Sequence, residues 1–158
     1  MTRVMFGYLG HYNKDARSPY DTYYMGGDGM SGYSNIDGRQ LVGFRGYANE
    51  SLTPDSYLSS PPGGTIFNKS TLELRYPLSL NPNSTIFGLV FVEAGNSWRK
   101  FKEYNPFDVR RSAGVGVRVF LPMFGLLGLD WGYGFDKIPG SPDANKGQFH
   151  FSINSSID

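Results

Sequence analysis

The sequence has no cysteine, which excludes a disulfide framework and any metal site built on thiolates. It also lacks a run of about 18 apolar residues, so no transmembrane helix is expected. The longest apolar stretch, 120–129, is interrupted by Pro122 and two glycines. Charged residues are few, at 18%, and the net charge of +1 gives no electrostatic reason to expect nucleic acid as a partner.

Residue combinations typical of catalysis or cofactor binding are also missing. The sequence shows no Ser/His/Asp arrangement and no pair of carboxylates spaced for acid–base chemistry. The segment 26–29 is glycine-rich, but neither a helix nor a basic residue follows it, as a phosphate-binding loop would require. His11 and His150 are too few and too far apart in sequence for a metal site. We therefore expect no enzyme activity, no cofactor and no metal ion.

What the chain does contain is glycine (21), tyrosine (11) and phenylalanine (12), in segments where apolar and small or polar residues alternate. Alternation with period two is typical of β-strands that have two different faces. It recurs in about six segments, which are 4–12, 67–76, 85–98, 112–121, 127–136 and 148–154. The sequence therefore predicts one all-β domain, 1–158, built from antiparallel strands.

Strand length and loop length favour a membrane β-barrel over a soluble β-domain that binds a ligand. Strands of about nine to eleven residues are long enough to cross a tilted bilayer. Short turns at 81–84 and 123–126 alternate with long polar connections at 99–108 and 137–146, and a very long loop spans 13–64. Aromatic residues near strand ends are expected at the membrane interface, namely Trp98, Trp131, Tyr133 and Phe135.

The long loop carries the tetrapeptide Phe44-Arg45-Gly46-Tyr47, and two later strands each carry one acidic residue, Glu73 and Glu93. Both glutamates have the parity that faces the lumen, so they can be neighbours across adjacent strands. A guanidinium between them can donate to both carboxylates, which lysine cannot do with the same geometry. The sequence predicts a loop-to-wall lock made by Arg45, Glu73 and Glu93.

Three further expectations accompany this lock. Gly46 lets the loop backbone approach the wall closely. Phe44 and Tyr47 anchor the tip of the loop by packing. Asp130 and Asp136, which also face the lumen, are interpreted as solvated lumen charges without a special role.

Several of these segments, taken in order, resemble one family. Phe44-Arg45-Gly46-Tyr47 is similar to the Val-Arg-Gly-Phe/Tyr motif in the sixth loop of the BamA-type outer-membrane insertase superfamily, also called the bacterial surface antigen type. Segment 19–27 resembles the aromatic run ending in Gly-Gly that precedes this motif. Segments 71–77 and 91–98 resemble the next two strands, with Glu93 standing where the family usually has aspartate. Segments 111–117 and 149–153 resemble the last strands, the final one carrying Phe149, Phe151 and Ile153.

The resemblance implies that the chain is the C-terminal portion of a transmembrane β-barrel, about six strands of an expected sixteen. The earlier strands and the periplasmic POTRA domains have no counterpart in it. It further implies a protein of the bacterial outer membrane that folds and inserts other barrel proteins. The partners would be unfolded barrel proteins, accessory outer-membrane lipoproteins, the lipid bilayer and lipopolysaccharide. A passive secretion channel of the same superfamily is the alternative, and a soluble ligand-binding β-domain is the third possibility.

Overall fold

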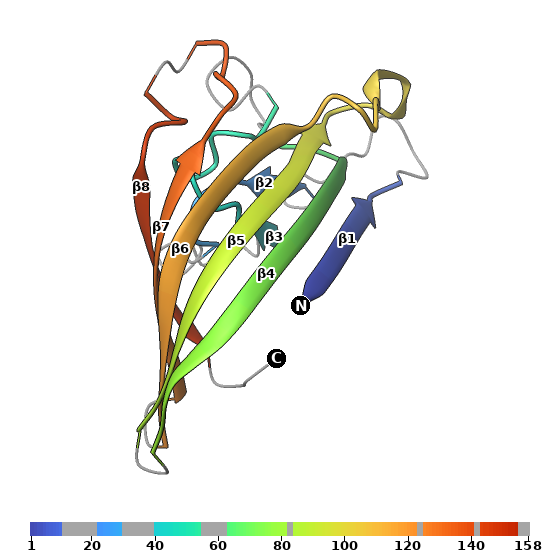
Figure 1. Ribbon diagram of the computed structural model, residues 1–158. Coiled ribbons are helices and arrows are strands. Elements are labelled where there is room, and N and C mark those ends of the chain that lie inside the picture. The colour runs from blue at the N-terminus through green and yellow to red at the C-terminus, as the bar shows by residue number, and fades with distance from the viewer. Residues whose placement is uncertain are drawn as a thin grey trace.

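The computed structural model describes residues 1–10, 22–29, 40–54, 63–81, 84–122, 125–140 and 143–154. Six strands form one antiparallel sheet, in the order β1-β4-β5-β6-β7-β8 (Figure 1). Their bounds are Thr2–Tyr8 for β1, Ile66–Asn81 for β4, Ser84–Trp98 for β5, Arg110–Leu121 for β6, Gly125–Gly134 for β7 and Gln148–Asn154 for β8. The predicted all-β antiparallel fold is confirmed, and the six predicted segments correspond to these six strands.

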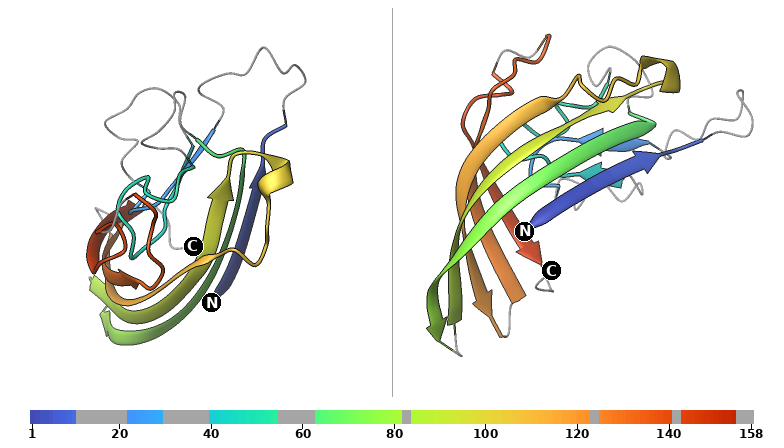
Figure 2. Two further views of the ribbon diagram at one scale, coloured as in Figure 1. Left: turned by 90° about the horizontal axis from the view of Figure 1, so that it is seen from above. Right: turned by 45° about the vertical axis from the view of Figure 1, so that its right-hand side comes forward.

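The long loop between β1 and β4 has structure of its own, which the sequence did not predict. Two short strands, β2 (Tyr23–Met25) and β3 (Gln40–Val42), pair in parallel within it. At three residues each, they are too short to show a period-two pattern. Both lie on the concave side of the curved six-stranded sheet (Figure 2). The segment 19–21, His11 and the residues 155–158 lie outside the described part of the chain.

The two faces of the sheet differ as the alternation predicts. On the convex face, Leu74, Tyr76 and Leu80 of β4 are each 70% exposed. On the concave face, Glu73, Glu93 and other polar side chains are buried beneath the loop. The sheet therefore turns its apolar side chains outward and covers its polar ones, the reverse of a soluble domain and the arrangement of a barrel wall in a membrane. Its edge strands are β1 and β8, so these six strands form an open sheet. No helix in the described ranges is both long and apolar enough to cross a membrane.

The connection between β5 and β6 contains a short 3-10 helix, η2 (Phe101–Glu103), and the following Tyr104 packs against Trp98 of β5 and Phe6 of β1. Trp98, expected among the aromatic residues of the membrane interface, is covered by this connection. The Trp98 side chain is only 6% exposed because the ring of Tyr104 packs edge-on against it, with the ring centroids 4.9 Å apart. Trp131, Tyr133 and Phe135, by contrast, all have exposed rings on the outer face.

Candidate functional site

Backbone hydrogen bonds hold the loop in place on both sides of Arg45, one within the loop and one to the wall. Phe44 donates its amide to the carbonyl of Gly27 at 2.9 Å, which joins the two halves of the loop. Gly46 donates its amide to Nε2 of His150 on β8, also at 2.9 Å. Arg45 lies between these two anchors, so the loop backbone determines where its guanidinium enters the wall.

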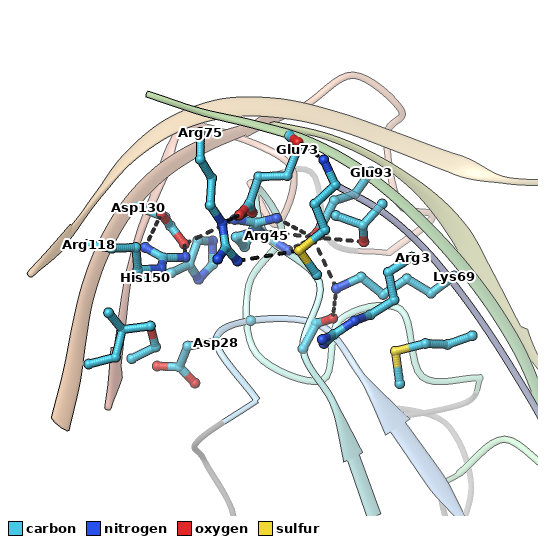
Figure 3. A pocket seen from close by; sticks show the side chains of 17 residues that line it. Arg3, Asp28, Arg45, Lys69, Glu73, Arg75, Glu93, Arg118, Asp130 and His150 are labelled. Carbon is cyan, nitrogen blue, oxygen red and sulfur yellow. Dashed lines mark hydrogen bonds and ion pairs between the residues drawn. The ribbon is translucent and has the colours of Figure 1, made fainter. Parts of the chain in front are cut away.

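The Arg45 side chain reaches three carboxylates from three different strands (Figure 3). Glu93 of β5 accepts from Nη2 at 2.8 Å and from Nε at 3.0 Å, and its second oxygen accepts from the Arg45 amide at 2.9 Å. Glu73 of β4 and Asp130 of β7 both accept from Nη1, at 3.1 Å and 3.3 Å. One guanidinium thus connects strands that are not all neighbours in the sheet.

Each of the three carboxylates has a second cation that comes from the wall itself. Lys69 Nζ lies 3.1 Å from Glu93 Oε1, and Arg75 Nε lies 2.7 Å from Glu73 Oε1. Arg118 makes a two-point contact with Asp130, with both N–O distances at 2.6 Å. We call Arg45, its three carboxylates and these three cations the ion-pair cluster. The cluster contains three negative and four positive charges. Without Arg45, its three carboxylates are balanced by three cations of the wall.

Aromatic side chains surround the arginine. Its guanidinium carbon lies 3.6 Å from the ring centroid of Phe91, a cation–π geometry. Phe44 and Tyr47 are completely buried, and their rings meet edge-on at 5.5 Å. The Tyr47 hydroxyl donates to the carbonyl of Arg111 at 2.9 Å. Both predicted packing residues therefore fill the space between the loop and the wall.

Glycine allows the close approach of the loop to β7. Gly46 has a φ of +86°, in the left-handed region that favours glycine. A Cβ on Gly132 would stand 2.6 Å from the Gly46 nitrogen, and one on Gly134 would stand 2.7 Å from its oxygen. The inward positions of β7 thus form a glycine groove that only a glycine in the loop can enter.

Burial shifts the pKa values of both Arg45 and Tyr47, and at Arg45 nearby carboxylates oppose its effect. Burial alone lowers the pKa of the Arg45 guanidinium, but the attraction of Glu93, Asp130 and Glu73 outweighs it, so the pKa is raised. Burial raises the pKa of the Tyr47 phenol. Arg45 therefore stays charged, and Tyr47 stays a neutral donor, over the whole physiological range.

The structure brings Arg45, Glu73 and Glu93 together, in a strand register that the sequence had left open. Glu73 lies opposite Phe91, and Glu93 lies opposite Thr71, so the two glutamates are diagonal neighbours and not a direct pair. The Phe91 ring stands between them, under the guanidinium. This offset lets one planar group reach both carboxylates from a single side.

The interpretation of Asp130 as a solvated lumen charge is wrong. Its side chain is almost fully buried and contacts Arg45 and Arg118. Asp136 also has specific partners, because it accepts three hydrogen bonds from the amide and guanidinium of Arg111. Sequence reasoning missed Lys69 and Arg118 as well. The only signal for them was their lumen-facing parity, which many ordinary positions share.

His150 and the other predicted residues of the final strand are held by hydrogen bonding and strand pairing within the fold. His150 accepts from the Gly46 amide, and His11 lies outside the described residues. Within the described ranges, no three His, Cys, Asp or Glu side chains are placed to hold a metal ion. Phe149, Phe151 and Ile153 project from the outer face of β8.

Two comparisons with known proteins were informative to different degrees. A search among curated proteins found no match to the chain. The Omp85 superfamily domain matches residues 1–157, which is nearly the whole sequence. Because this match covers the six-stranded sheet together with the loop that carries Arg45, the chain belongs to the Omp85 superfamily, whose members are outer-membrane proteins of bacteria or organelles that insert or secrete other proteins.

Proposed function

We propose that this chain is part of a BamA-type assembly factor, which folds and inserts other β-barrel proteins into the bacterial outer membrane. The observation that carries the proposal is the loop-to-wall lock, in which Arg45 joins β4, β5 and β7 through three buried carboxylates. The lock keeps this part of the wall rigid while a weaker part of the barrel opens. No covalent step, nucleotide or cofactor is required.

The weaker part in this proposal is the seam between β8 and the first strand of the barrel, as the family resemblance implies. Strand β8 pairs with β7 over only seven residues, whereas β4 pairs with β5 over fifteen. When this seam opens, β8 presents an unpaired backbone edge. A free backbone edge can add an incoming strand by β-augmentation. Unfolded barrel proteins would be the substrates, with accessory outer-membrane lipoproteins, lipopolysaccharide and the bilayer as further partners.

The experiment uses the full-length gene in a host depleted of its own copy. Arg45→Ala, Glu73→Gln and Glu93→Gln are compared for growth and for the amount of assembled barrel proteins. We expect each variant to reduce assembly, and the double variants that combine Arg45→Ala with a glutamate change to be non-additive, because the residues act as one unit. Glu103→Gln, an exposed glutamate on the β5–β6 loop, is the matched control.

A passive secretion channel is the alternative, because β2 and β3 of the loop lie on the concave side of the sheet (Figure 2), which would face the path of an exported chain. In that case the same variants would leave assembled barrels unchanged and would alter the export of one partner protein. Full assembly in all three variants would therefore reject the assembly function.

A further inference from the structure

The connection between β5 and β6 lies against the outer face of the sheet, where a membrane protein meets lipid. Asn96 and Trp98 have the outward parity of β5, yet both are buried. The Asn96 side-chain amide donates to the carbonyl of Asp108 at 2.8 Å, which ties the far end of the connection down onto the strand. The connection is therefore a packed element with a fixed position on the membrane side of the wall.

Aromatic rings join this connection to β1. The Tyr104 ring meets Phe6 at 6.0 Å between centroids and Trp98 at 4.9 Å, and Phe101 meets Tyr8 at 6.0 Å. We call Phe6, Tyr8, Trp98, Phe101, Tyr104 and Phe107 the aromatic foot. Its outermost rings remain largely uncovered, because Phe101 is 67% exposed and Phe107 is 90% exposed.

Exposed lysines stand beside these rings. Lys100 and Lys102 flank Phe101, and both side chains are exposed. In Figure 1, η2 lies close to the ends of β1 and β5. Aromatic rings with neighbouring lysines at the end of a membrane-facing strand match the chemistry of the interface, where rings lie at headgroup level and ammonium groups meet phosphate.

We propose that the aromatic foot is a binding site for an anionic membrane lipid. Lys100 and Lys102 contact the lipid phosphate, while Phe101 and Phe107 lie against its glycerol and upper acyl region. A protein partner fits less well, because the foot continues directly into the exposed apolar outer face of β1 and β4, which faces acyl chains. The site depends on the outer-membrane location of the superfamily and is independent of the assembly function.

The test uses the full-length protein in nanodiscs that contain equal amounts of phosphatidylglycerol and phosphatidylcholine. Native mass spectrometry then gives the ratio of anionic to zwitterionic lipid retained by the protein. We expect Lys100→Gln/Lys102→Gln to lower this ratio by about twofold or more, since each lysine near an anionic surface contributes measurably to binding. The charge-conserving pair Lys100→Arg/Lys102→Arg should keep the ratio of the wild type.

Lys137→Gln/Lys146→Gln is the matched control, because it removes the same charge from the β7–β8 connection, where both lysines are exposed. An equal fall in the control would mean that the preference comes from overall charge, and an unchanged ratio in every variant would mean that the foot binds no anionic lipid. Either result overturns the proposal. It is also overturned if Lys100→Gln/Lys102→Gln leaves the lipid ratio unchanged and instead releases a protein that co-purifies with the wild type. A heat-modifiability gel confirms that each variant is folded before its ratio is compared.

Discussion

Two arginines fasten connecting segments to the wall of this protein, and their surroundings differ sharply. Arg45 and Arg111 both make short contacts with carboxylates, 2.8 Å to Glu93 and 2.9 Å to Asp136. The Arg45 and Glu93 side chains are 12% and 1% exposed, whereas those of Arg111 and Asp136 are 62% and 20% exposed. Water screens the second pair, so similar distances correspond to very different contributions to stability.

The two regions also differ in how their charges are balanced. The Arg111–Asp136 contact is a simple pair, so removing either side chain has a similar effect. In the ion-pair cluster, each carboxylate keeps its own wall cation, so the wall remains neutral when Arg45 leaves. The loop is therefore held by a charge that the wall does not need for its own neutrality.

The largest effect is expected from Glu93→Gln. It leaves Arg45 and Lys69 facing a neutral amide and raises the excess positive charge of the cluster. Removing one partner of a buried ion pair typically lowers the free energy of unfolding by about 3–5 kcal/mol. The measurement is denaturant unfolding of the full-length protein, with Glu103→Gln as the exposed control. A loss no larger than that of the control would show that the cluster is effectively solvated.

A smaller effect is expected from Arg45→Ala, because the three carboxylates keep their wall cations. The loss should be about 1.5–3 kcal/mol, the range for hydrogen bonds to charged groups. Arg45→Lys should restore little, since an ammonium group cannot reproduce the planar fork. The same unfolding assay tests which of the two substitutions, Arg45→Ala or Glu93→Gln, destabilises the protein more. If Arg45→Ala destabilised the protein more than Glu93→Gln, the wall cations would not neutralise the carboxylates as proposed.

Gly132→Ala tests the groove beneath the loop without changing any charge. The added methyl group would meet the Gly46 backbone, which must shift, and overpacking of this kind costs about 1–3 kcal/mol. Gly88→Ala on β5 is the control, because its Cβ would make only ordinary contact with Leu78 at 3.4 Å. Limited proteolysis within the long loop provides the readout, and faster cleavage is expected for Gly132→Ala alone. Equal cleavage of both variants would mean that the loop does not depend on the groove.

The smallest effect is expected at Asp136. Hydrogen bonds from Arg111 hold the pKa of this carboxyl below its usual value. Its contribution to stability is therefore complete above the ordinary aspartate pKa of about 3.9 and is lost as the pH falls through the lowered folded-state value. The unfolding midpoints of wild type and Asp136→Asn should differ slightly at neutral pH and converge in acid. A difference that grew in acid would reverse this assignment.

Local pattern was enough to predict the wall but only part of the site. Period-two alternation located all six strands of the sheet, because each strand faces two different environments. The tetrapeptide around Arg45 and the two glutamates stood out because charge is rare in this chain. Asp130, Lys69 and Arg118 did not stand out, since each is one polar residue among many on the lumen side. Their importance comes from contacts with residues up to 85 positions away.

By itself the sequence determined an all-β chain with one apolar and one polar face, and it identified the arginine that joins loop to wall. Only the tertiary structure decided the register that sets Glu73 and Glu93 diagonally around Phe91, and the placement of Asp130 as the third carboxylate. It also decided that Trp98 is covered by Tyr104 instead of facing lipid. The physical reason is that alternation depends on neighbours along the chain, whereas register and burial depend on how distant segments meet.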